Sequence, residues 1–278
     1  NDCDININYG SSSINMRGFA AEQFPQLPDL AGDMQASVKG ELFSRMVKQT
    51  AIASANDEIQ PILTGIMLDI NGEQLNLVAT DFHRLTLCQG VWQTQSQQQT
   101  QVIVPAKTML DVANLADAEE QVEISISHNN ACFKMGATIF VSRLISGQFP
   151  DYRPIVPKEE SFKHQVYVSK QLLGSALRRA SLLSKDANNT VRLKFEEGQI
   201  VMTANTTDIG NIREVIPADF QGEELMVGYN LKYLLDFLKV SSSENIYMKL
   251  SGNLTPGVML EEDNASFTYI VLPLRLID

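Results

Sequence analysis

The sequence has no long apolar run, and it contains little cysteine, histidine or tryptophan. Its 278 residues include three Cys, three His and one Trp. No run approaches the roughly 18 apolar residues that a helix needs to cross a bilayer. The residues from Asn1 to Asp4 also carry no basic stretch followed by an apolar one. We therefore expect neither a membrane span nor a signal peptide.

The few cysteine and histidine residues are spaced too widely to suggest a disulfide framework or a metal site. Cys3, Cys88 and Cys132 are odd in number and form no Cys-x-x-Cys pair, which fits a protein of the reducing cytoplasm. His128 and His164 have no set of His, Cys or carboxylate neighbours at metal-binding spacing. The phosphate-loop, dinucleotide and nucleophile-elbow motifs are also absent. The sequence thus predicts no metal and no cofactor.

Positive charge is scarce as well. The chain has 22 Lys and Arg residues against 33 Asp and Glu, a formal net charge of −11. This balance by itself argues against a nucleic-acid partner, because binding to phosphates depends on Lys and Arg. The hydrophobic share of 44% excludes a collagen-like or disordered chain. The length allows one large domain or roughly two to three small ones.

What the sequence does contain is an internal repeat. Phe24-Pro25 recurs as Phe149-Pro150, an offset of 125 residues, and the same offset places 74–80 on 199–205. Each unit has the order of an amphipathic helix, a hairpin, a strand, a second helix and further strands. We expect helices at 41–54, 105–116, 169–184 and 230–241, starting near Pro105 and Asn230 in two of them. The expected hairpin turns are Asn71-Gly72, of type I′, and Glu197-Gly198.

The repeat predicts the domain organisation and the fold class. Residues 37–160 and 161–278 form two equivalent modules, joined by a linker at 156–161. Residues 1–36 look like the end of a third module, with strands at 5–9 and 14–19, and 93–101 is predicted to be a solvated loop. We expect an α+β fold of repeated modules, each with two helices packed on antiparallel sheets.

The basic residues are concentrated in the four expected helices. These helices hold eight basic and three acidic residues, whereas the rest of the chain is strongly acidic. For any single helix, solvated Lys and Arg on an exposed face are the ordinary explanation. Because all four helices share the bias, the alternative is a weakly positive surface that contacts the backbone of duplex DNA without reading bases. Its DNA-facing residues would be Arg45, Lys48, Lys107, Arg178, Arg179, Lys232 and Lys239.

Four segments, in order along the chain, resemble the bacterial sliding clamps, the β subunits of DNA polymerase III. They are Leu63-Thr64-Gly65, VATDFHRL from Val78 to Leu85, GQFPDYR from Gly147 to Arg153, and YIVLPLRL from Tyr269 to Leu276. The resemblance implies a DNA-clamp (processivity) fold and no catalytic activity. It also implies a function: a ring around duplex DNA, formed by a homodimer of three-module subunits, that tethers the replicative polymerase.

The resemblance further implies a cleft at the border of the middle and last modules. This cleft would bind short linear peptides of the polymerase, the clamp loader and repair polymerases, each carrying a Gln and apolar anchors. We expect Leu85, Ile155, Ile270 and Leu272 to line one open apolar pocket. The complete set implied for the cleft is Leu63, Thr80, His83, Arg84, Leu85, Pro150, Arg153, Ile155, Asn230, Tyr233, Pro256, Ile270, Leu272, Pro273, Leu274 and Arg275.

Two features depart from the family pattern, and one segment invites a different function. Phe82 stands where the family usually has a small residue, and Ile277-Asp278 extend past the usual C-terminal end. Asp81, His83 and Arg84 could serve as an acid/base pair beside a cation, which gives the alternative of an uncharacterised hydrolase. No Ser or Cys nucleophile motif stands beside them, so structural hydrogen bonding or peptide contact is favoured.

The expected assembly of the chain follows from what a closed ring requires. A head-to-tail ring needs two different surfaces on each subunit, one from the first module and one from the last. Residues 1–36 hold neither expected helix and too little apolar sequence for a core. We expect the chain as given to be a monomer or a weak non-ring associate in solution, and the full-length protein to be a homodimer.

Overall fold

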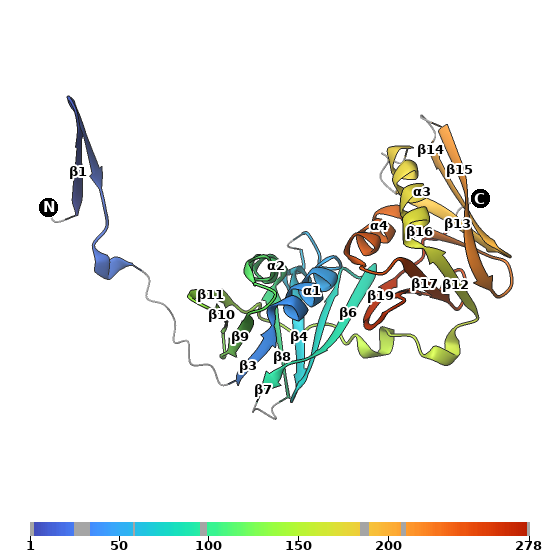
Figure 1. Cartoon of the computed structure of the whole chain (residues 1–278), viewed down its shortest axis with the longest axis horizontal. Coiled ribbons are helices and arrows are strands. Elements are labelled where there is room, and N and C mark those ends of the chain that lie inside the picture. Colours follow the sequence, from blue (N-terminus) through green and yellow to red (C-terminus); the bar gives the residue numbers. More distant parts are fainter. Residues whose placement is uncertain are drawn as a thin grey trace.

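In the computed structural model, two units of sheet and helix join edge to edge through their strands (Figure 1). The structure describes residues 3–24, 34–57, 59–94, 99–183, 189–206 and 210–276, with the side chains of Leu183 and Thr206 left aside. Every strand pair in this part of the chain is antiparallel, as the repeat predicts. The predicted α+β class is confirmed.

The middle unit has two helices and nine strands in the described residues. The helix α1 begins one residue earlier than predicted and ends at Ala51, ahead of the predicted end at residue 54. The elements are β3 Met34–Lys39, α1 Gly40–Ala51, β4 Gly65–Asn71, β5 Gln74–Thr80, β6 Arg84–Val91, β7 Gln93–Thr94, β8 Gln99–Pro105, α2 Ala106–Leu115, β9 Gln121–Ile126, β10 Asn130–Met135 and β11 Thr138–Arg143.

The last unit repeats this order after two short 3-10 turns at Arg153–Ile155 and Glu159–Ser161. Its helices also match the sequence expectation in place, apart from residue 184, which lies outside the described residues. The elements are β12 His164–Ser169, α3 Lys170–Leu183, β13 Thr190–Glu196, β14 Gln199–Thr206, β15 Gly210–Gln221, β16 Leu225–Asn230, α4 Leu231–Val240, β17 Asn245–Leu250, β18 Gly257–Glu261 and β19 Asn264–Val271.

The two units share one sheet. Its twelve strands run β16-β13-β14-β15-β12-β17-β18-β19-β6-β5-β4-β8, and a separate five-stranded sheet, β11-β10-β9-β3-β7, completes the middle unit. The joint between the units is the pairing of β6 with β19, in which Leu85 lies opposite Ile270. A sheet that continues across the boundary fixes the two units in register.

The hairpins that carry the repeat coincide, although one turn type was predicted wrongly. The two-residue turns are Gly72-Glu73 and Glu197-Gly198, which lie at the expected offset of 125. Gly72 and Gly198 have φ of +56° and +76°, a conformation that favours glycine. Asn71 is the last residue of β4 and has no positive φ, so the turn is not the expected type I′ Asn-Gly turn.

A continuous apolar core lies between the helices and the sheets of both units. On α1 the buried residues Phe43, Met46, Val47 and Thr50 recur at helical spacing, so one face of the helix packs inward. Gly40 starts this helix because a Cβ there would lie 1.9 Å from the Asp117 carbonyl oxygen.

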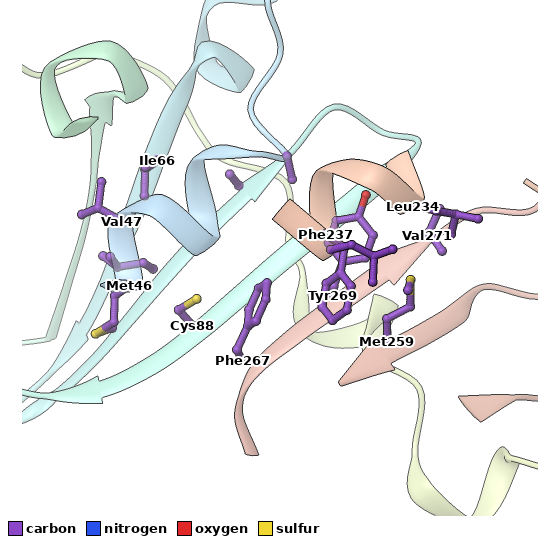
Figure 2. Close-up of a cluster of buried hydrophobic side chains, with 14 of the residues drawn as sticks. Met46, Val47, Ile66, Cys88, Leu234, Phe237, Met259, Phe267, Tyr269 and Val271 are labelled. Atoms are coloured by element: carbon purple, nitrogen blue, oxygen red, sulfur yellow. The ribbon is translucent and has the colours of Figure 1, made fainter. Parts of the chain in front are cut away.

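The core crosses the joint between the units. Figure 2 shows Phe237 of α4 beside Phe267 and Tyr269 of β19, with ring centroids 5.5 and 5.3 Å away, and Cys88 and Met46 of the middle unit follow in the same layer. The helices of the two units thus pack over one shared layer.

Asn230 caps α4 as predicted, since its Oδ1 accepts the Lys232 N–H at 2.9 Å.

A second apolar cluster covers the opposite face of the joint. It contains Leu85 and Ile270 together with Phe149 and Tyr152 from the GQFPDYR segment. The Tyr152 hydroxyl donates to the buried Asp69 carboxylate at 2.7 Å. The cluster and this hydrogen bond therefore hold the segment after β11 against the sheet at the border of the units.

The N-terminal residues form a hairpin. β1 Asp4–Tyr9 pairs with β2 Ser12–Arg17, close to the two predicted strands, and a 3-10 turn follows at Ala21–Gln23. All side chains of this hairpin are exposed. The Phe24-Pro25 corner continues beyond the described residues, and β3 begins at Met34, ahead of the predicted boundary at residue 37.

The prediction of a solvated loop at 93–101 is wrong at both ends of that range. Gln93–Thr94 and the first residues of β8, from Gln99, lie in strands, because they pair with β3 and β4. Residues 95–98 between them lie outside the described residues, as do Ile277 and Asp278.

Candidate functional site

A tight turn between β5 and β6 brings several predicted site residues to the joint. The Thr80 hydroxyl oxygen accepts the Phe82 N–H at 3.1 Å, and the same hydroxyl donates to the Arg84 carbonyl at 2.8 Å. Asp81 Oδ1 accepts the N–H groups of His83 and Arg84, each at 3.0 Å. These bonds hold Phe82 at φ +68°, which costs a residue other than glycine about 1 kcal/mol.

The Arg84 guanidinium links the two units. It donates to Asp81 Oδ2 at 3.0 Å and, through Nη1, to Asp236 of α4 at 2.6 Å. It also lies over the Tyr233 ring, 4.3 Å from the centroid, and only 4% of its side chain is exposed. Burial lowers the pKa of Arg84, but Tyr269 and Asp236 raise it by more, so the guanidinium stays charged.

The same contacts argue against the hydrolase alternative. The Asp81 carboxylate accepts two backbone N–H bonds and the Arg84 side chain, so both of its oxygens have structural partners. A general base has to be free to accept a proton from a substrate, so Asp81 is not placed to act as one. The His83 ring stacks on Tyr233 at 6.4 Å between centroids, which leaves its ring nitrogens open, but no Ser or Cys side chain of the described residues lines the crevice beside it. The segment therefore serves the turn and the joint between units, and no feature of the described residues supports catalysis.

A crevice of about 480 Å³ opens beside this turn. Its walls come from the turn, from the start of α4 and from the segment after α1. Five of the predicted cleft residues line it together with Phe82 and Lys232: Leu63, His83, Arg84, Asn230 and Tyr233.

The C-terminal segment runs alongside the turn. The Leu272 N–H donates to the His83 carbonyl at 2.9 Å, and the Leu274 N–H donates to the Gly228 carbonyl at 2.8 Å. Leu272 is 38% exposed, Pro273 and Leu274 are half-buried, and Arg275 is exposed. These bonds place the last predicted cleft residues within reach of the β5–β6 turn.

The four residues expected to line one open apolar pocket differ in exposure. Leu85 and Ile270 are 2% and 1% exposed, because they face each other across the β6–β19 joint and are covered by the second cluster. Ile155 and Leu272 are exposed, so they remain available on the surface. The prediction that all four line an open pocket is therefore wrong for Leu85 and Ile270, and for Ile155 and Leu272 it stays a prediction.

The remaining predicted cleft residues take different positions. Thr80 is buried in the turn, and Pro150 is half-buried. Arg153 is exposed and donates to Asp69 Oδ2 at 2.8 Å. Pro256 is half-buried just before Gly257, which pairs with Val271 at the end of β19.

Sequence reasoning missed two acidic residues that organise this region. Asp236, one of the three acidic residues in the expected helices, pairs with Arg84 across the joint. Asp69 was not singled out, and it binds both Tyr152 and Arg153. An acidic residue inside the apolar run of β4 was the available signal, since a buried carboxylate needs partners. Burial and the bond to Asp69 raise the pKa of Tyr152 to about 12.

The predicted basic residues gather mainly between the helices. Arg45 and Lys48 of α1 and Lys232 and Lys239 of α4 line one groove of about 740 Å³. Lys239 also borders a neighbouring groove of about 790 Å³, which Arg178 lines from α3. Two of the predicted residues lie elsewhere: Lys107 is exposed on α2, and the Arg179 guanidinium is held by Glu214 at 2.6 Å.

Within the part of the chain that the structure describes, no three His, Cys, Asp or Glu residues gather as a metal site would require. No helix in those residues has the length and apolar content of a membrane span. The candidate site consists of a crevice beside the β5–β6 turn and a basic groove between α1 and α4, on a fold of helices packed against antiparallel sheets.

Comparison with known proteins gives the family. The description "DNA polymerase III beta subunit, central domain" matches residues 37–151, and "DNA polymerase III beta subunit, C-terminal domain" matches residues 153–275. Proteins named beta sliding clamp from Pseudomonas putida and Escherichia coli K12 are 30% and 31% identical to this chain. Each match covers 97% of this chain and 73% of the relative.

The solved structures agree. The DNA polymerase III subunit beta from Pseudomonas aeruginosa superposes with a TM-score of 0.91 at 30% identity, over 99% of this chain and 76% of that one. This chain belongs to the DNA polymerase III beta subunit family, and its function is that of a non-catalytic processivity factor of the replicative polymerase.

Proposed function

We propose that this chain moves along duplex DNA on its helix face and binds partner peptides in the crevice beside the β6–β19 joint. The single observation that carries the proposal is this joint, which sets the helices of both units along the same side of one continuous sheet (Figure 1). We expect the protein in the bacterial cytoplasm, where the replicative polymerase acts.

The DNA contact rests on the groove between α1 and α4. Two basic residues from each helix line it, and α1 and α4 belong to different units. Few cations without base-reading partners give weak binding to the phosphate backbone, without sequence preference. Arg178 and Lys107 extend the surface over α3 and α2. Arg179 contributes least, because Glu214 offsets its charge.

Salt dependence tests the DNA contact. The slope of log affinity against log salt decreases by about 0.9 for each phosphate contact that is removed. Anisotropy with a labelled duplex should give a shallower slope for the Lys232→Gln, Lys239→Gln double variant than for the wild type. Arg179→Gln is the matched control and should leave the slope unchanged. An unchanged slope in the double variant, or sequence-specific binding at high salt, would contradict the proposal.

The peptide cleft rests on the crevice and the segments around it. His83 and Asn230 line the crevice and offer polar groups to a Gln side chain, and Leu272, 38% exposed, offers apolar surface on the neighbouring C-terminal segment. The partners would be short linear peptides of the replicative polymerase, the clamp loader and repair polymerases. The other implied cleft residues either support this surface from beneath, as Leu85 and Ile270 do, or flank it, as Ile155 does.

We also propose the domain organisation and the assembly that follow from the repeat. Residues 37–160 and 161–278 act as two modules, and 1–36 as the end of another. In the described residues, β11 lies at the edge of its sheet, and Gly210 to Pro217 of β15 pair on one side only, with β14. By the repeat, β15 corresponds to β6, whose edge β19 occupies. A full-length protein would therefore close a head-to-tail homodimeric ring through such edges.

Sedimentation tests the assembly. For the chain as given, we expect a monomer or a weak non-ring associate at micromolar concentration. A stable two-fold dimer in analytical ultracentrifugation would contradict this, and would mean that the interface lies elsewhere or that residues 1–36 carry more of it.

A further inference from the structure

The side chain of Glu261 is a buried carboxylate without a cation. Glu261 ends β18 and is 3% exposed. The register between β18 and β19 shifts between Leu260 and Glu261, and such irregularities re-aim a side chain. Among the described residues, Glu261 takes part in no ion pair. A buried charge needs hydrogen bonds from its neighbours, and those neighbours are therefore held in place by it.

The two carboxylate oxygens of Glu261 bind groups from both units. Oε2 accepts a hydrogen bond from Gln49 Nε2 of α1 at 3.2 Å, and a second from Asn264 Nδ2 at 2.7 Å. Oε1 accepts the Ser242 N–H at 2.5 Å and lies 3.4 Å from the Ser242 hydroxyl. Ser242 directly follows the C-cap residue of α4. One carboxylate therefore connects α1 of the middle unit to the end of α4 in the last unit.

These contacts lie next to the basic groove. Gln49 is buried, and it lines the groove together with Arg45 and Lys48 of α1 and with Lys232 and Lys239 of α4. The two helices belong to different units, so the distance between the two pairs of cations depends on how α1 is held against α4. The phosphates of duplex DNA recur at a fixed spacing. Cations on two helices therefore contact one duplex together only while their own spacing is held.

We propose that Glu261 is a positioning residue for the DNA contact. It holds α1 and the end of α4 at a fixed spacing, so that cations of both helices contact the backbone of one duplex. The inference rests on the DNA contact proposed above. Charge alone predicts the opposite effect, because a carboxylate near the groove repels phosphates and its removal would strengthen binding. The sign of the change therefore separates the two roles.

Two substitutions break the connection in different ways. Glu261→Gln keeps the size of the side chain, but its amide nitrogen cannot accept a hydrogen bond, so the contact with Gln49 or with Ser242 is lost. Gln49→Met keeps the length of the α1 side chain, removes its donor and changes no charge. By anisotropy with a labelled duplex, each variant should bind about fivefold more weakly than the wild type. The slope of log affinity against log salt should become shallower by about 0.9, the equivalent of one phosphate contact.

Two matched controls separate position from charge and from stability. Glu123→Gln removes a carboxylate that pairs with Lys134 on the five-stranded sheet, outside the groove, and should not weaken binding. Asn264→Ala removes the donor to Glu261 that belongs to neither helix. It should lower the urea midpoint of unfolding but keep the affinity and the salt slope of the wild type.

The contrary outcomes are distinct from one another. Tighter or unchanged binding by either Glu261→Gln or Gln49→Met overturns the positioning role and leaves the DNA contact standing, even where the urea midpoint falls. Equal weakening in Asn264→Ala assigns the effect to stability and overturns the role as well. If Glu261→Gln does not fold, Gln49→Met decides alone. Failure of the wild type to bind the duplex overturns the DNA contact itself, and the role of Glu261 with it.

Discussion

The middle and last units share an order of elements but differ at one edge. In the last unit, β15 is a single strand of 12 residues that pairs with β14 and then with β12. In the middle unit the corresponding strand is divided at the buried Trp92 into β6 and β7, which pair with β5 and β3. The outer edge of β6 is occupied by β19, whereas the matching edge of β15 is open in the described residues.

The difference shows that corresponding strands of the two units, β6 and β15, can have different neighbours. The edge of β6 became an internal joint, with apolar clusters on both faces and the Arg84 contacts at its end. The edge of β15 kept half-exposed side chains such as Val215. An unpaired edge is a template for pairing with another strand. The same sequence signal therefore predicts a strand in both units, but not what lies beside it.

The largest expected effect comes from a charge at the joint. Ile270→Asp places a carboxylate among the apolar side chains of the second cluster, at a position where the native side chain is 1% exposed. We expect the free energy of unfolding to fall by about 4 kcal/mol, measured in urea. Val215→Asp on the open edge is the matched control and should cost less than about 1 kcal/mol. Equal losses would show that the two edges do not differ.

Arg84→Ala should give the next largest effect. It removes the guanidinium from between Asp81 and Asp236 and leaves both carboxylates without their cation. Breaking a buried pair in this way costs about 3 kcal/mol. Arg179→Ala, in the last unit, breaks a pair with Glu214 that is half-exposed, and should cost less than about 1 kcal/mol. A similar loss for both variants in urea unfolding would refute the difference.

Leu272→Asp tests the surface of the joint rather than its core. The side chain is 38% exposed, so the substitution should leave stability nearly unchanged. It should weaken peptide binding by about 2 kcal/mol, as loss of an interface anchor does. Calorimetry with a Gln-x-x-Leu-x-Phe peptide measures this. Leu115→Asp, on α2 and away from the crevice, should have no effect on binding. An unchanged dissociation constant for Leu272→Asp would exclude the site.

The smallest expected effect is the pH dependence of the hydrogen bond between Tyr152 and Asp69, which attaches the segment after β11 to the sheet. The pKa of Tyr152 is raised by burial and by Asp69, from 10 to about 12. The folded state therefore keeps the proton that the unfolded state loses. The stabilisation is complete below pH 10 and is lost as the pH rises through 12.

Thermal melting between pH 9 and pH 12 checks this sign. Tyr152→Phe should lower stability by about 1 kcal/mol at neutral pH, through the lost hydrogen bond, and should flatten the alkaline decline. Tyr9→Phe, on the exposed N-terminal hairpin, is the control and should retain the decline. A decline of the same size in Tyr152→Phe would assign it to other groups.

The N-terminal hairpin shows that an alternating sequence predicts a strand but not the burial of its side chains. Ile5, Ile7 and Tyr9 alternate with polar residues on β1, so the sequence predicts a two-faced strand. β9 has a similar alternation, but its Val122, Ile124 and Ile126 are buried in the core of the middle unit. In the described residues no helix covers the hairpin, and its apolar side chains stay exposed. Alternation is a property of the strand, whereas burial depends on a partner from elsewhere.

The candidate site was predicted by motif rather than by physical pattern. The segments VATDFHRL and GQFPDYR identified the right region, since Arg84 pairs with Asp236 across the joint and Tyr152 packs in the cluster that holds Leu85 and Ile270. Their exposure could not be read from the sequence: Leu85 was expected on the surface and is buried beneath it. Strand pairing between residues far apart in the chain decided this.

The sequence by itself determined the repeat, the helices and the hairpins of each unit, because these depend on periodicity and turn residues within a few positions. It also determined that the helices carry the basic residues. The tertiary structure alone decided that β19 pairs with β6, that Arg84 contacts Asp236, and that Phe82 holds a left-handed turn. These features depend on contacts between distant segments or on a backbone angle that neighbouring hydrogen bonds impose, and neither leaves a periodic signal in the chain.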